Sequence, residues 1–133
     1  MADYIDKLAF VELVDGKILS TMSKGKDTWY IPGGKREGDE TDEQALIREV
    51  KEELNVDILP ETIEQYGVFE AQAHGKPEGT VVRMTCYTAK FSGEPSASSE
   101  IEQIAYLGYS DKESTSAVDQ LIFDDLHQKG LLK

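Results

Sequence analysis

Three glutamates, Glu49, Glu52 and Glu53, lie close together near the middle of the chain. On a helical wheel at about 100° per residue they share one wedge. Glu49 and Glu53 form a like-charge pair four residues apart, which costs a few tenths of a kcal/mol in a bare helix. Crowded carboxylates attract a counter-ion, and oxygen ligands suit hard cations such as Mg²⁺ or Mn²⁺. The spacing therefore fits either a divalent-cation site or a solvated helix face.

The helix that would carry these glutamates is clearly marked in the sequence. Leu46, Val50 and Leu54 recur at four-residue steps and form an apolar stripe beside the acidic wedge. Thr41 and Gln44 have the spacing of a capping box, which satisfies backbone donors at a helix start. Asn55 tolerates the left-handed conformation that ends many helices. The pattern predicts a helix from about 42 to 54.

The remaining segments predict strands and a second helix. Residues 8–14 and 17–19 read as a hairpin that turns at Asp15-Gly16. Residues 29–31, 63–71, 80–91 and 101–109 read as further strands. Ser116 is placed to cap a final helix that ends near Gly130. Strands that alternate with helices indicate the α/β class.

Composition limits the classes of function. The chain has 133 residues, with 14 Lys+Arg against 26 Asp+Glu and a formal net charge of −12. This length fits one domain, and such acidity disfavours duplex nucleic acid as a partner. The sequence shows no long apolar run and no leader pattern, so no membrane partner is expected. Cys86 has no second cysteine to pair with, which agrees with a reducing cytoplasmic location and a buried apolar role.

Residues 34–56 closely resemble the Nudix signature: G, five residues, E, seven residues, then R-E-U-x-E-E-x-G-U, where U is aliphatic. The matching positions are Gly34, Glu40, Arg48, Glu49, Val50, Glu52, Glu53 and Val56. Asn55 stands where the family usually has glycine, a tolerable change for a residue that adopts the left-handed conformation. The resemblance implies a single Nudix domain over residues 1–133, folded as an α/β/α sandwich with a mixed β-sheet between helices.

The resemblance also implies a function. Nudix enzymes hydrolyse a nucleoside diphosphate linked to another group, using Mg²⁺, or Mn²⁺ in its place, and a metal-activated water. Glu49, Glu52 and Glu53 would be the catalytic carboxylates and metal ligands. The Gly33 carbonyl would be a further ligand. Glu100 would add another from a later loop, as in mutator-type enzymes, with Glu94 and Glu102 as its rivals.

The same resemblance implies structural roles for other residues of the signature. Gly34, Glu40 and Arg48 would hold the site together, with Arg48 positioning Glu40 or Glu52.

Weaker candidates for substrate contact lie outside the signature. Arg83 could reach a phosphate. Phe69, Tyr87 and Trp29 could stack on a nucleobase, although core packing is the commoner role for such residues. His74 could assist as a base, although a loop histidine is more often solvated.

The sequence does not identify the substrate. Nudix subfamilies often differ 16 to 18 positions past the signature, where Gln72, Ala73 and His74 match neither the proline of ADP-ribose enzymes nor the tyrosine of dinucleoside polyphosphate enzymes. A nucleoside triphosphate is the default small-molecule partner. Family members are often dimers, so a homodimer is compatible with the resemblance.

Two other functions compete with catalysis. One is a catalytically inactive Nudix-like module that binds or senses a nucleotide, and the other is an acidic interaction protein without a site. Retention of all three glutamates favours the enzyme.

Overall fold

The computed structural model describes residues 3–73 and 76–133. His74, a predicted candidate base, lies outside the described residues. Among the described residues, no helix is long and apolar enough to span a membrane.

The strands of the described residues form three sheets. The largest is mixed, in the order β4 (Gly33–Gly34), β1 (Asp3–Phe10), β7 (Thr80–Thr88) and β6 (Glu64–Gln72). In it β1 and β7 run parallel, and the other two pairings are antiparallel. The second sheet is antiparallel, in the order β2 (Leu13–Val14), β3 (Lys17–Ser23) and β9 (Ile101–Leu107). The third pairs β5 (Asp57–Ile58) with β8 (Phe91–Ser92).

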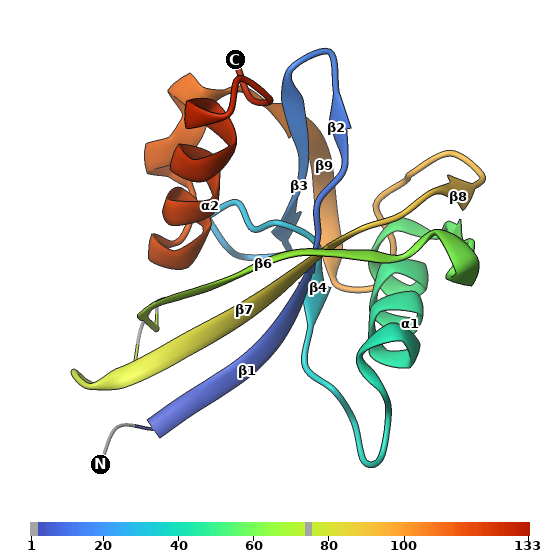
Figure 1. Cartoon of the computed structure of the whole chain (residues 1–133), viewed down its shortest axis with the longest axis horizontal. Coiled ribbons are helices and arrows are strands. Elements are labelled where there is room, and N and C mark those ends of the chain that lie inside the picture. The colour runs from blue at the N-terminus through green and yellow to red at the C-terminus, as the bar shows by residue number, and fades with distance from the viewer. Residues whose placement is uncertain (1–2, 74–75) are drawn as a thin grey trace.

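Two helices flank the mixed sheet. Helix α1 (Asp42–Leu54) and helix α2 (Ala117–Gln128) lie on opposite sides of it, while β1, β7 and β6 extend past both (Figure 1). Two short 3₁₀ helices, η1 (Pro60–Thr62) and η2 (Tyr109–Ser114), complete the fold. The expected α/β/α sandwich is confirmed.

Alternation along β1 creates two apolar cores, because successive side chains of a strand point to opposite faces. Leu8 and Phe10 pack with the α1 residues of one core. Ala9 belongs to the other core, which contains the apolar residues of α2. Central strand β1 therefore fixes both helices against the sheet.

Helix α1 begins and ends as the sequence predicts. The Thr41 side chain accepts a hydrogen bond from the Gln44 amide at 3.2 Å, and the Gln44 side chain accepts one from the Thr41 amide at 3.0 Å. Asn55 adopts φ 56° and ψ 39°, the left-handed conformation. Its side chain thus replaces glycine without displacing the end of the helix.

Other boundaries differ from the predictions. The hairpin joins only β2 to β3, while β1 pairs with β7 and β4. In the predicted strand 29–31, Trp29 and Tyr30 make isolated bridges and no strand forms. Ser116 occupies the N-cap position of α2, but its side chain makes no capping hydrogen bond. The helix ends at Gln128, before Gly130 with φ 77°.

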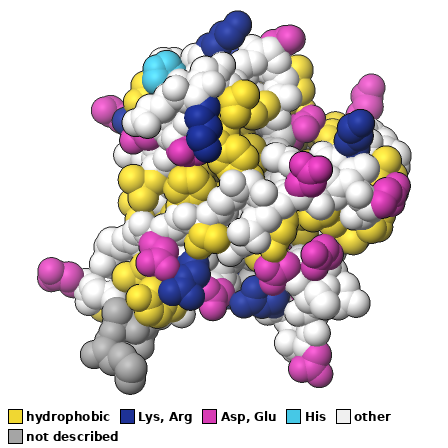
Figure 2. All heavy atoms as spheres, viewed as in Figure 1, with side chains coloured by type: hydrophobic (Ala, Val, Ile, Leu, Met, Phe, Trp, Pro, Cys, Tyr) yellow, Lys and Arg dark blue, Asp and Glu magenta, His cyan; other side chains and the backbone are white. Residues whose placement is uncertain are grey.

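Acidic side chains are scattered over the face shown in Figure 2, where Lys and Arg are fewer. This distribution agrees with the net charge of −12. A site that binds a polyphosphate on such a protein needs its own local source of positive charge.

Candidate active site

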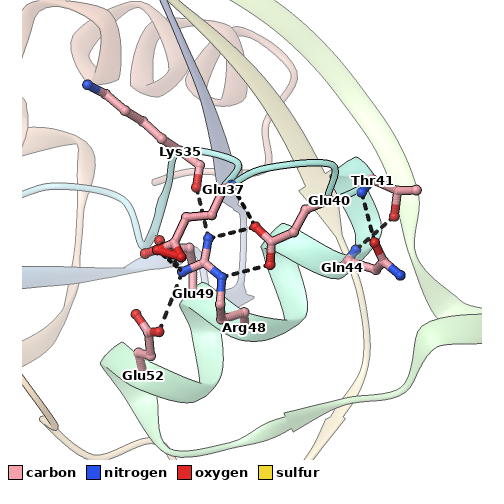
Figure 3. Close-up of polar contacts among 8 residues, drawn as sticks. All are labelled: Lys35, Glu37, Glu40, Thr41, Gln44, Arg48, Glu49 and Glu52. Atoms are coloured by element: carbon pink, nitrogen blue, oxygen red, sulfur yellow. Dashed lines mark hydrogen bonds and ion pairs between the residues drawn. The ribbon is translucent and has the colours of Figure 1, made fainter.

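Arg48 is the centre of a network around the start of α1 (Figure 3). Its Nε and Nη2 donate to both carboxylate oxygens of Glu40, at 2.8 and 2.9 Å. Nη1 donates to Glu49 at 2.8 Å and lies 3.5 Å from Glu52, and Nη2 also donates to the Lys35 carbonyl at 2.9 Å. The hydrogen bond from Arg48 lowers the pKa of Glu40 to about 2. Arg48 therefore ties Glu49 and Glu52 of the helix to Glu40 and the Lys35 carbonyl before it.

Two glycines allow close approaches to β4, one from helix α1 and one from strand β1. A Cβ on Gly34 would lie 2.5 Å from the Glu49 carboxyl carbon. Gly33 has φ +146°, and a Cβ there would lie 1.9 Å from the Leu8 carbonyl oxygen. The Gly33 amide donates to Glu53 Oε1 at 3.1 Å. Glycine at position 33 thus allows β4 to lie against β1, and glycine at position 34 leaves room for the Glu49 carboxyl group.

Burial and the neighbouring carboxylate charges oppose ionisation of Glu53 and Glu49. Burial raises the pKa of Glu53 to about 8; the Gly33 amide acts in the opposite direction, and the charges of Glu49 and Glu52 add to the rise. Burial also raises the pKa of Glu49, against the hydrogen bond from Arg48. Closely spaced carboxyl groups that resist ionisation would gain from a bound cation.

The predicted glutamates surround one depression of about 210 Å³, which we call the acidic hollow. Its lining residues are Ser23, Glu49, Glu52, Glu53, Ser99, Glu100 and Ile101. Glu100 therefore lies with the helical glutamates, whereas its rivals Glu94 and Glu102 do not line this hollow.

The donor chemistry of the acidic hollow fits Mg²⁺, which prefers carboxylate oxygens and keeps several of its waters. Among residues 3–73 and 76–133, however, no three His, Cys, Asp or Glu side chains form a ready-made metal cage. Glu49 is held by Arg48 and Glu53 by the Gly33 amide. Closing a cage would therefore require side-chain rotations.

A longer cleft continues from the acidic hollow. Ser23, Glu53 and Ile101 also line a neighbouring depression of about 270 Å³, the central hollow, together with Gly33 and Gly34. Lys7, Tyr30 and Met84 line the central hollow and also a third depression, the α2 hollow, at the start of α2. Apolar side chains contribute much of this third wall: Ile5, Ala73, Val82, Met84 and Val118. The cleft thus joins carboxylates at one end to an apolar chamber at the other.

The weaker candidates for substrate contact do not line these three hollows. Arg83 is exposed on the other face of the sheet, 2.6 Å from Glu70 and over the Tyr4 ring. Phe69 and Trp29 pack against the α2 core.

Tyr87 is buried in the α1 core, and its hydroxyl donates to Asp42 at 2.6 Å. Core packing is therefore the observed role of the aromatic candidates, and Cys86 is buried as expected.

Sequence reasoning missed Lys7, Tyr30 and Met84, which line the middle of the cleft. One signal was available for Lys7: alternation along β1 places it on the same face as Ile5 and Ala9, so a charged residue interrupts an apolar face. Tyr30 and Met84 carry no such signal, because residues that line an apolar pocket have the same sequence pattern as residues of the hydrophobic core.

Solved structures share this fold. The solution structure of the E. coli ORF135 protein aligns with a TM-score of 0.73 and 23% identity, covering 96% of this chain and 91% of that one. The crystal structure of a MutT Nudix hydrolase from Burkholderia pseudomallei aligns with a TM-score of 0.75 and 22% identity, covering 92% and 97%.

Several relatives match by sequence. The chain is 42% identical over 50 residues to an 8-oxo-dGTP diphosphatase of Proteus vulgaris, covering 38% of this chain and 40% of the relative. It is 36% identical over 77 residues to a MutT-like protein of Streptomyces ambofaciens, covering 52% and 49%. The chain thus spans less than half the length of each. The model of the NUDIX domain matches residues 8–121, most of the sequence, and the chain therefore belongs to the Nudix family.

Proposed function

We propose that the protein is a divalent-metal-dependent pyrophosphohydrolase that cleaves the phosphoric anhydride bond of a nucleoside triphosphate or a related nucleoside diphosphate derivative. The observation that carries this proposal is the acidic hollow, where Glu49, Glu52, Glu53 and Glu100 meet at one end of a cleft. The relatives described as an 8-oxo-dGTP diphosphatase and a MutT-like protein support a mutator-type substrate.

Each part of the site has a role in this reaction. When bound, Mg²⁺ would neutralise the diphosphate and lower the pKa of an attacking water. Glu49, Glu52, Glu53 and Glu100 would hold the ion, and the Gly33 carbonyl is a fifth candidate. Arg48 and Glu40 fix the orientation of Glu49, and Gly34 leaves room for it. Attack of water at phosphorus breaks the anhydride P–O bond, so a triphosphate yields a nucleoside monophosphate and pyrophosphate.

The direct test is a panel of nucleoside triphosphates, oxidised nucleotides and nucleoside diphosphate derivatives, incubated with Mg²⁺ or Mn²⁺ and followed by product chromatography. We expect a nucleoside monophosphate from at least one compound. Binding without hydrolysis across the panel would overturn the enzyme assignment in favour of a nucleotide-sensing module.

Variants test whether the reaction takes place at the acidic hollow. Glu53→Gln replaces a carboxyl group that could ionise to hold the cation with a neutral amide of the same size, and we expect turnover to fall roughly a hundredfold or more with the fold intact. Glu100→Gln should slow the reaction less. Glu43→Gln is the matched control, since Glu43 is exposed in the first turn of the same helix. Undiminished turnover in Glu53→Gln would contradict the metal assignment.

A further inference from the structure

Lys7 is placed in the middle of the cleft by strand β1. Its neighbours on the same face of the strand, Ile5 and Ala9, pack with the α2 core. Lys7 itself is partly buried and lines both the central hollow and the α2 hollow. It is therefore a lysine built into an otherwise apolar floor, at the junction of two depressions.

The Lys7 ammonium group has no close partner in the part of the chain that the structure describes: no hydrogen bond and no ion pair within 4.0 Å is formed there. Arg36, Arg48 and Arg83, by contrast, all form ion pairs. Burial lowers the pKa of Lys7, as does Lys35, while Asp119 and Glu53 act in the opposite direction. A partly buried ammonium without a close anion is unfavourable, so its presence needs a reason beyond packing.

The position of Lys7 along the cleft indicates which anion would pair with it. The central hollow connects Lys7 to Glu53 of the acidic hollow. On the other side, Lys7 borders the α2 hollow with its apolar wall. If the anhydride lies at the glutamates and the nucleoside lies in the apolar chamber, the phosphate that joins them must pass Lys7.

We propose that Lys7 is a substrate-binding residue whose ammonium group pairs with the phosphate next to the nucleoside. This proposal rests on the proposed function, which supplies the orientation of the nucleotide. An ammonium group is a compact point charge with three donors and suits a phosphate oxygen well. In a protein of net charge −12, it supplies positive charge in the cleft that does not depend on a metal.

Lys26 is one rival for this role because it also lines the central hollow. It is exposed, however, so water can solvate its charge without cost. It also does not line the α2 hollow, where the nucleoside would lie. Lys76 is a second rival, because it lines the α2 hollow, but it is exposed and does not line the central hollow. Lys7 borders both hollows, so the geometry favours Lys7 over Lys26 and Lys76.

The test uses Lys7→Met, which keeps a long apolar stem and removes the charge. Lys17→Met is the matched control, because Lys17 is exposed at the start of β3 and causes the same change in net charge. Lys26→Met tests the first rival. Thermal unfolding of each variant checks the fold, and Lys7→Gln provides a second neutral variant should Lys7→Met not fold. Lys7→Arg retains the charge and should recover part of the affinity.

The probe is inorganic pyrophosphate with Mg²⁺, measured by isothermal titration calorimetry. We expect Kd to rise about tenfold or more in Lys7→Met, and to change little in Lys17→Met and Lys26→Met. Unchanged binding in both neutral Lys7 variants would overturn the proposal. So would a wild-type protein that does not bind pyrophosphate, or a larger loss in Lys26→Met.

Kinetics separate this proposal from the proposed function. For a nucleotide that is hydrolysed, Lys7→Met should raise KM more than it lowers kcat. If no nucleotide is hydrolysed but pyrophosphate binding still depends on Lys7, the proposed function fails and the anion site stands. If hydrolysis proceeds and neither KM nor pyrophosphate binding changes, Lys7 alone is misassigned.

Discussion

At the scale of single residues, Asp119 is a buried carboxyl group outside the acidic hollow. It is fully buried in α2, and its Oδ2 accepts a hydrogen bond from the Ile31 amide at 3.0 Å. Oδ1 has no hydrogen-bond partner among the described residues. Burial raises the pKa of Asp119 from 3.8 to about 7, although the Ile31 amide opposes the rise. Asp119 therefore links folding to pH.

The sign of this link follows from proton uptake. Between the ordinary pKa and the raised one, the folded protein binds more protons at Asp119 than the unfolded chain does. The contribution of Asp119 to the free energy of unfolding is thus present at low pH and is lost as pH rises to about 7. We expect Asp119→Asn to become relatively more stable than the wild type between about pH 5 and about pH 8. Urea denaturation at both values measures this, with exposed Asp39→Asn as the control, and parallel pH dependences in wild type and Asp119→Asn would disprove it.

Single residues also show what sequence alone can supply. The spacing of Glu49, Glu52 and Glu53 identified the acidic wedge, and the resemblance added Glu100, which lies beside them. The sequence did not identify Lys7 and Met84 as cleft residues, because they lie side by side only through the pairing of β1 with β7. That pairing joins residues almost eighty positions apart, which no local pattern encodes.

At the scale of elements, strand β4 is short but positions the glycines that line the site. It pairs with β1 and carries Gly33 and Gly34 beneath the acidic helix. Helix α1 was predictable because its caps and apolar stripe are local signals. Strand β4 was not, since two glycines have no strand preference and are extended here only through tertiary pairing.

The two glycines should respond differently to alanine. In Gly33→Ala the new Cβ would meet the Leu8 backbone, so we expect a loss of about 3 kcal/mol or more in the free energy of unfolding. In Gly34→Ala it would meet the flexible end of Glu49, so stability should fall less while turnover falls sharply. Urea denaturation and nucleotide turnover distinguish the two effects.

Gly38→Ala is the control for backbone strain, because Gly38 has φ +53° and open space around its Cα. It should cost about 1 kcal/mol. A Gly33→Ala protein as stable as Gly38→Ala would refute the steric argument.

At the scale of the whole molecule, the net charge of −12 works against folding and against anionic ligands. A cation held in the acidic hollow would relieve both effects locally. We expect Mg²⁺ to raise the melting temperature, with a gain of about 2.7 kcal/mol at one hundred times Kd, and EDTA to reverse it. The measurement is thermal unfolding against NaCl of matched ionic strength, since general screening also stabilises an acidic protein.

A double variant, Glu49→Gln with Glu53→Gln, should lose the part of the gain that is specific to Mg²⁺, whereas Glu43→Gln should keep it. Equal stabilisation by Mg²⁺ and NaCl in the wild-type protein would argue against a specific ion site.

The cleft is walled by two different sheets: Lys7 and Met84 belong to the mixed sheet, while Ser23 and Ile101 belong to β3 and β9. A nucleotide lying in it would touch both and act as a tie between them. Opening motions that part the two sheets would then have to expel the ligand first. Resistance of the protein to proteases should therefore rise with the fraction of molecules whose cleft holds a nucleotide.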